Sequence, residues 1–194
     1  ILDTSGSMGS AVTTQAPYDP AITYNGACDS SRVYWRLNSG TPPDCTVTTQ
    51  WFNATGLACD AAVQGINVAG RYLAQRAGQW NATTNHWEQV RTSNKVEPVE
   101  CSADAGVHGG TTGDPEVYAF NSGVANDRWT ADPGNQVDWD ASPINQSYTF
   151  YSANWLNWRN DTSNFVTSTR LQIVQSAANS LIGSISGVDI GLMR

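Results

Sequence analysis

Residues 1–9 read ILDTSGSMG, and this stretch carries the strongest indication of the fold. Two apolar residues, typical of the end of a buried strand, run into Asp3, Ser5 and Ser7 at alternate positions. In an extended loop at the carboxyl end of a strand, side chains two residues apart point the same way and can reach one ligand. One carboxylate and two hydroxyls form an oxygen set that suits Mg²⁺ or Ca²⁺. The alternative is that these side chains cap the segment that follows.

A second signal for the same fold class lies near the other end of the chain. From residue 170 onward, apolar side chains recur at positions 171, 174, 178, 181 and 185, which predicts one face of a helix over 170–182. Ser168 or Thr169 can cap its start, and Gly183 or Gly187 its end. Residues 188–193 then alternate as in a strand. Strand, helix and strand build a covered sheet, so the predicted fold class is α/β.

The stretch between the first strand and this helix differs in character. It is rich in turn residues and contains all four cysteines and all eight tryptophans. We therefore expect α/β elements at 1–9 and 168–194, with a large α+β insertion at 10–167. The insertion has these candidate elements: a helix at 59–79, strands at 31–36 and 116–120, and a segment at 148–158 that fits a helix or a strand. Gly65 and Gly70 weaken the helix prediction.

Composition limits the classes of partner. The chain carries a formal net charge of −7, and 14% of its residues are charged. A nucleic-acid partner is not expected, because phosphate contacts need concentrated Lys and Arg. No apolar run approaches the roughly 20 residues of a membrane-spanning helix, so no membrane span is expected.

The cysteines indicate the redox compartment. They form an even set without a CxxC pair, and the two histidines are far from metal-ligand spacing. This pattern favours disulfides, formed in an oxidising compartment, over a zinc site or buried thiols. Three pairings are open to four cysteines. We favour Cys28–Cys45 with Cys59–Cys101, because the first pair closes a short loop that contains proline.

The remaining polar and aromatic clusters favour structural roles. The tryptophans fit a core better than a glycan-stacking surface. Asp132, Asp138 and Asp140 fit a solvated loop better than a calcium site, since their spacing departs from a calcium loop. Asp104 and His108 fit a hydrogen-bonded pair in a turn. The sequence has no nucleophile signature, so catalysis is not expected.

The segment Asp3-Thr4-Ser5-Gly6-Ser7-Met8 resembles the DxSxS metal motif of von Willebrand factor A domains. The predicted helix at 170–182 and the strand at 188–193 resemble the first helix and the second strand of that fold. The resemblance implies that Asp3, Ser5 and Ser7 form the first metal-binding segment, to which the family fold adds a Thr and an Asp from two later loops. Mg²⁺ or Ca²⁺ needs about six oxygens, so we expect weak metal binding or none without those loops. We also expect the chain to be a piece of a longer protein, because the motif places Ile1 in mid-strand.

The insertion resembles a narrower family. Residues 99–109, VECSADAGVHG, resemble a block of the PilC/PilY-type proteins of bacterial type IV pili, and the segments at 18–35, 151–158 and 191–194 fit the same family. The resemblance implies a non-catalytic extracellular protein that is exported through the periplasm and acts at or near the pilus tip in pilus biogenesis, adhesion and surface sensing. Its implied partners are other pilus-tip or minor pilin proteins and a host or surface receptor. The alternative is a generic secreted A-domain module for metal-dependent adhesion or glycan binding.

Overall fold

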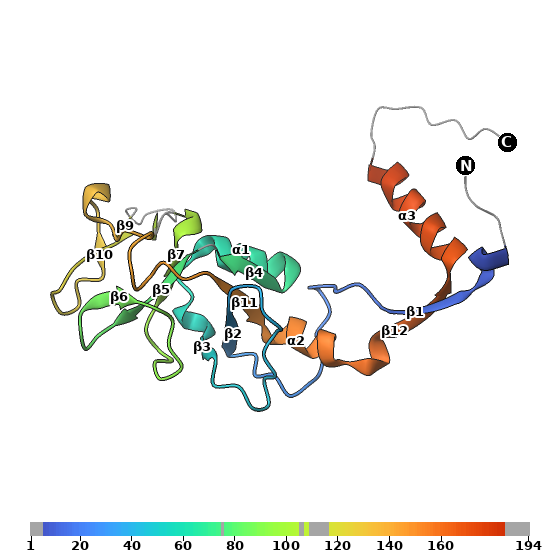
Figure 1. Cartoon of the computed structure of the whole chain (residues 1–194), viewed down its shortest axis with the longest axis horizontal. Coiled ribbons are helices and arrows are strands. Elements are labelled where there is room, and N and C mark those ends of the chain that lie inside the picture. Colours follow the sequence, from blue (N-terminus) through green and yellow to red (C-terminus); the bar gives the residue numbers. More distant parts are fainter. Residues whose placement is uncertain (1–5, 75, 105–106, 109–116, 185–194) are drawn as a thin grey trace. The chain divides into compact units, whose positions relative to one another are not determined.

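The chain divides into two compact units. A computed structural model describes residues 6–74, 76–104, 107–108 and 117–184 (Figure 1). The terminal unit combines residues 1–17 with 162–194, and the inserted unit spans residues 18–161. Helices and strands are mixed in the described residues, which agrees with the predicted mixed class.

The terminal unit is built on a two-stranded antiparallel ribbon. Its described elements are η1 (Gly6–Gly9), β1 (Ala11–Gln15), η5 (Thr162–Asn164), β12 (Phe165–Thr169) and α3 (Arg170–Ser184). β1 pairs with β12 from Ala11↔Thr169 to Gln15↔Phe165, and α3 follows β12 directly (Figure 1). The helix prediction is confirmed, whereas the ribbon was not predicted. The strands predicted at the two ends of the chain lie outside the described residues.

The start of α3 shows the predicted cap. The Gln172 backbone N–H donates to Thr169 Oγ1 at 3.2 Å, and the Thr169 N–H donates to Gln172 Oε1 at 2.8 Å. This reciprocal pair is a capping box, which satisfies donors at a helix start. It explains why the helix begins immediately after β12.

A four-stranded antiparallel sheet forms one half of the inserted unit. In spatial order its strands are β3 (Trp51–Asn53), β2 (Arg32–Leu37), β11 (Tyr148–Ser152) and β4 (Arg71–Ala74). Two helices contact it: α1 (Asp60–Ala69) contacts β4 and β11, and α2 (Ala153–Asn160) contacts β11 and β2. The predicted strand at 31–36 is confirmed by β2. The segment at 148–158 forms a strand and then a helix.

Two smaller antiparallel sheets form the other half. One contains β6 (His86–Glu88), β5 (Ala77–Asn81) and β7 (Val99–Cys101), and the other β10 (Trp129–Thr130), β9 (Val117–Ala119) and β8 (Val107–His108). β9 confirms the predicted strand at 116–120. Three short turns of 3₁₀ helix complete the unit: η2 (Ala54–Gly56), η3 (Ser102–Asp104) and η4 (Pro133–Asn135).

The helix predicted at 59–79 is wrong beyond residue 69. α1 ends at Gly70, whose φ of +71° is left-handed and whose N–H donates to the Ile66 carbonyl. A Cβ on Gly70 would lie 2.5 Å from Trp155 Cβ, so the backbone conformation and the packing both require glycine there. The following residues form β4 and β5. The apolar residues of β4 and β5 happen to continue the helical spacing of α1, so the predicted helix was too long.

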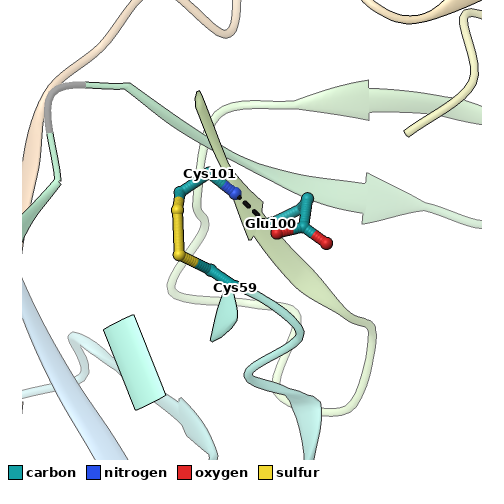
Figure 2. Close-up of side chains that lie close together, drawn as sticks. All are labelled: Cys59, Glu100 and Cys101. Atoms are coloured by element: carbon teal, nitrogen blue, oxygen red, sulfur yellow. Dashed lines mark hydrogen bonds between the residues drawn. A yellow bond between two sulfur atoms is a disulfide. The ribbon is translucent and has the colours of Figure 1, made fainter. Parts of the chain in front are cut away.

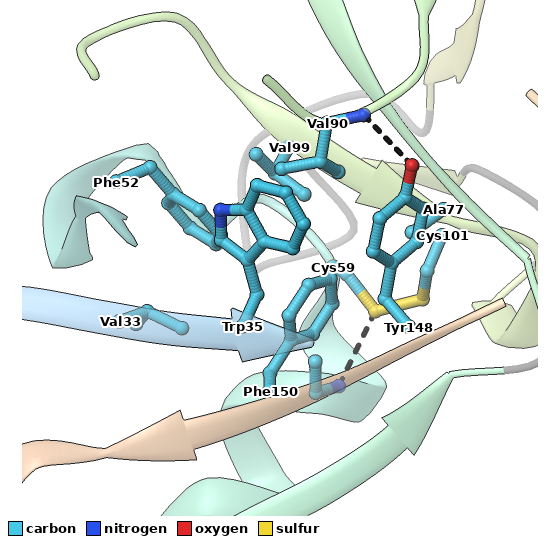
Figure 3. Close-up of a cluster of buried hydrophobic side chains, with 11 residues drawn as sticks. Val33, Trp35, Phe52, Cys59, Ala77, Val90, Val99, Cys101, Tyr148 and Phe150 are labelled. Carbon is cyan, nitrogen blue, oxygen red and sulfur yellow. Dashed lines mark hydrogen bonds between the residues drawn. A yellow bond between two sulfur atoms is a disulfide. The ribbon is translucent and has the colours of Figure 1, made fainter. Parts of the chain in front are cut away.

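Aromatic side chains dominate the core. β11 sends Tyr148 and Phe150 to one side, where they meet Trp35 and Phe52 with ring centroids 5.5 and 5.7 Å apart in edge-to-face geometry (Figure 3). The Val90 backbone N–H donates to the Tyr148 hydroxyl. Each of the eight tryptophans is buried or partly buried. The prediction that they form a core is confirmed.

Candidate functional site

The DxSxS segment is only partly described by the structure. Asp3 and Ser5 lie outside the described residues, so the predicted metal site stays a prediction. Ser7 is exposed in η1, and its carbonyl accepts from the Ser10 N–H.

The motif and the predicted helix meet in the terminal unit. The Arg170 N–H, at the start of α3, donates to the Ser10 carbonyl at 3.2 Å, and α3 contacts η1. β1 precedes the inserted unit in the sequence and β12 follows it, and the two strands pair with each other. Residues far apart in sequence thereby become neighbours, and the helix begins beside the turn that contains Ser7.

The disulfides follow the favoured pairing. Cys28 is bonded to Cys45 and Cys59 to Cys101, with Cα atoms 5.3 Å apart in each pair. The second bond joins the start of α1 to β7. Cys59 Sγ also accepts from the Ala62 N–H at 3.3 Å and caps that helix.

One buried cluster contains metal-ligand residue types. Cys59 Sγ, Cys101 Sγ and a Glu100 carboxylate oxygen lie within 4.8 Å of one another (Figure 2). The two sulfurs are bonded to each other, and thiolates are what a metal needs from cysteine. Glu100 Oε1 accepts from the Cys101 N–H at 3.0 Å. The arrangement is therefore a buried crosslink beside a carboxylate.

The acidic residues predicted to form a solvated loop are exposed and serve local structure. Asp132 accepts from the Gly134 N–H at 2.8 Å, and Asp138 from the Asp140 N–H at 3.0 Å. Asp140 pairs with Arg76 at 2.9 Å. These contacts agree with a turn-rich loop.

The two histidines have no assigned chemistry. His86 is exposed, and its Nδ1 lies 2.8 Å from the Thr84 carbonyl. The side chains of Asp104 and His108 lie outside the part of the chain whose side chains are described. Their predicted hydrogen bond stays a prediction.

Among the charged groups of the inserted unit whose pKa values are shifted, Lys95 and Glu88 are partly buried. Burial, together with the charge of Arg32, lowers the pKa of Lys95, whose Nζ lies 4.3 Å from the Trp51 ring centroid. Burial raises the pKa of Glu88, but hydrogen bonds from Thr84 and Asn81 and the charges of neighbouring cations outweigh it, so the net shift is downward. The fold therefore favours the charged form of Glu88 and disfavours that of Lys95.

Sequence reasoning missed a cationic pocket in the inserted unit. The pocket has a volume of about 550 Å³ and is lined by the loop 39–42, the end of α1, strands β4 and β11, and Arg159 of α2. Arg71 and Arg159 supply two guanidinium groups to it, and the described residues that line it include no carboxylate. Neither arginine belongs to a motif, so only the tertiary structure could reveal the pair.

Within the described ranges, no helix is long and apolar enough to cross a membrane. Comparisons of the chain with family models, curated protein sequences and solved structures gave no match.

Proposed function

We propose that this chain belongs to a von Willebrand A-like domain of a secreted, non-catalytic type IV pilus-tip protein of the PilC/PilY type. The observation that carries the proposal is the hydrogen bond between the start of α3 and Ser10, beside the turn that contains Ser7. In an ordinary A domain the first helix follows the DxSxS motif directly. A long insertion is compatible with that fold only if its two ends lie side by side, so that the helix can still begin next to the motif. The pairing of β1 with β12 is consistent with this requirement.

The apolar side chains of α3 add support. Ile173 and Val174 are 40% and 36% exposed. A helix with an apolar face normally packs that face on a sheet. We propose that the sheet of an A domain, to which residues 1–2 and 188–193 contribute strands, covers this face in the whole protein.

The two disulfides support an extracellular location. Disulfides persist in the periplasm and on cell surfaces and are rare in the cytosol. Both disulfides lie in the inserted unit, so this unit would keep its shape when it meets other pilus-tip proteins, minor pilins or a receptor. We propose these as partners.

The proposed metal role concerns Asp3, Ser5 and Ser7. They would supply three oxygens to Mg²⁺ or Ca²⁺, and the other positions would be filled by later loops, water or an acidic group from a partner. Asp3 contributes the only charge of the three. It is therefore the residue whose loss should weaken the site most.

The test compares Asp3→Ala with Asp19→Ala in the full-length protein. Asp19 is an exposed carboxylate of the inserted unit and accepts from the Ala21 N–H, so its replacement removes the same charge away from the motif. We expect Asp3→Ala to reduce piliation and Mg²⁺- or Ca²⁺-dependent adhesion, and Asp19→Ala to leave both unchanged. Normal piliation and adhesion in Asp3→Ala would contradict the metal role. Normal piliation with lost metal-dependent adhesion would instead favour the generic adhesion module.

A further inference from the structure

We propose that the outer edge of β4 binds an extended peptide strand of a partner protein. An apolar residue of that strand would lie opposite Leu73, and an acidic residue opposite Arg71. β4 is the last strand at one side of the four-stranded sheet, where it pairs with β11. Such an edge can take up a further strand, because its main-chain N–H and C=O groups lack partners. The inference does not rest on the pilus assignment or on the metal motif.

The register of β4 against β11 determines which main-chain groups point outward. The Ser152 N–H donates to the Gly70 carbonyl at 2.8 Å. Hydrogen-bonded and non-hydrogen-bonded pairs alternate along an antiparallel ladder, so the main-chain groups of Tyr72 also face β11. The N–H and C=O groups of Arg71 and Leu73 therefore point away from β11. In the part of the chain that the structure describes, no other strand pairs with them.

The opposite edge of the same sheet is covered. β3 lies there, and its Asn53 N–H donates to the Lys95 carbonyl at 2.8 Å. The Lys95 side chain adds a second contact, because its Nζ donates to the Trp51 carbonyl at 2.9 Å. Proteins commonly block a free edge with a charged side chain or a loop, and β3 follows this pattern. The described residues provide no such hydrogen bonds to the outer edge of β4, which favours a binding role for that edge.

Leu73 makes this edge favourable for an apolar residue. Its side chain is 59% exposed although it lies within a strand. On the other side it pairs with Thr149 of β11, which leaves its outer side open to an added strand. A residue opposite Leu73 would bury part of this apolar surface, and such burial is favourable.

Arg71 supplies the charge that selects an acidic residue. It lies two positions from Leu73 in the strand, so the two side chains share one face of the sheet. Its Cζ lies 5.3 Å from the ring centroid of Trp155, which is 5% exposed, and this cation–π contact orients the guanidinium. Among the described residues, Arg71 forms no ion pair. A carboxylate opposite it would complete a cross-strand pair of opposite charges.

These two positions specify the sequence of the partner strand. In an antiparallel arrangement it reads apolar, any residue, acidic from its N-terminus to its C-terminus. The apolar and acidic residues would each exchange two hydrogen bonds with β4, whereas the N–H of the middle residue would point away. Arg71 and Leu73 also line the cationic pocket, so side chains of the added strand on this face would adjoin it.

The experiment titrates the 194-residue chain with the peptide acetyl-Thr-Val-Thr-Glu-Thr-amide and follows the backbone amides by NMR. We expect saturable shifts of the Arg71 and Leu73 amides. Replacing the glutamate of the peptide with lysine should weaken binding about threefold or more, because opposite charges across a strand pair attract and like charges repel. The absence of saturable shifts at these two amides, or equal affinity for the two peptides, would overturn the proposal.

N-methylated peptides provide a matched control. A methyl group on the nitrogen of the valine or of the glutamate removes a donor that faces β4, and it should abolish binding. The same methyl group on the central threonine nitrogen, which points away from β4, should leave binding intact. A similar loss from all three methyl groups would refute the addition of a strand.

Variants of Leu73 test whether the peptide binds at β4. Leu73→Pro removes an outward N–H without removing a hydrogen bond of the β4–β11 ladder, and proline is tolerated at such edge positions. It should abolish binding, whereas Leu73→Ala, which keeps the N–H, should only weaken it. Near-UV circular dichroism checks that each variant is folded, and the methylated peptides decide the question if Leu73→Pro is not.

Two further outcomes separate this proposal from others. Binding that survives in folded Leu73→Pro would refute the assignment to this edge. A dimer of the chain in sedimentation that Leu73→Pro dissociates would overturn the proposal by assigning the edge to a second copy. The Asp3→Ala variant should bind the peptide normally, so this proposal and the metal proposal fail separately.

Discussion

The Cys59–Cys101 disulfide should be the stronger of the two covalent crosslinks. It joins residues 42 apart in sequence, against 17 for Cys28–Cys45. The chain-entropy model converts these loops into about 4 and about 3 kcal/mol of stabilisation, because the longer loop restricts the unfolded chain more. Replacing Cys59 also removes a helix cap, since its Sγ accepts from the Ala62 N–H, which adds up to about 1 kcal/mol.

The assay is urea unfolding followed by tryptophan fluorescence. All eight tryptophans lie in the inserted unit, so the signal reports the part of the chain that contains both disulfides. We expect the free energy of unfolding to fall by about 4–5 kcal/mol in Cys59→Ala/Cys101→Ala and by about 3 kcal/mol in Cys28→Ala/Cys45→Ala.

The burial of the cysteines also predicts a larger loss of stability for the Cys59–Cys101 variant than for the Cys28–Cys45 variant. Cys59 and Cys101 are both 0% exposed in the core around Tyr148, whereas Cys28 is 8% exposed. Removing buried sulfur leaves a void whose lining loses contacts. A larger loss for the Cys28–Cys45 variant, or a loss below about 2 kcal/mol for the Cys59–Cys101 variant, would refute the reasoning.

Three further predictions follow from local geometry. Gly70→Ala should destabilise the inserted unit by about 2–5 kcal/mol in urea unfolding, because it combines a left-handed φ with a clash against Trp155, while Gly40→Ala, whose Cβ would meet nothing closer than 3.8 Å, should have a small effect. Because the folded-state pKa of Glu88 is lowered, its carboxylate stabilises the fold above the unfolded-state pKa and loses that effect as pH falls through the folded-state pKa. The stability difference between wild type and Glu88→Gln should therefore shrink on acidification, and a pH-independent difference would contradict the shift. Thr169→Ala should weaken the start of α3 by about 1 kcal/mol, measured as faster amide hydrogen exchange in its first turn.

The sequence-based predictions succeeded where the signal is local. α3 was predicted because its apolar spacing, its Thr169 cap and its start all lie within a few residues of one another. β2 was predicted for the same reason, from a short run of β-branched and aromatic residues. The prediction failed at Gly70, because the apolar residues of β4 and β5 continue the pattern of α1. The turn there is decided by packing against Trp155, which is distant in sequence.

One candidate site could be predicted from local sequence, whereas the other could not. Asp3, Ser5 and Ser7 stand at alternate positions, so their possible chemistry is readable from the chain alone, although the structure describes only Ser7. Arg71 and Arg159 carry no signal in the sequence, since neither belongs to a motif and they come from different elements.

By itself, then, the sequence determined the oxygen-rich motif, the capped helix and the set of cysteines. Only the tertiary structure decided that the chain returns through a ribbon to place α3 beside Ser10, and that two arginines meet over one indole. The physical reason is that capping and periodicity act over a few residues. Strand pairing and side-chain burial instead join segments whose separation along the chain leaves no pattern to read.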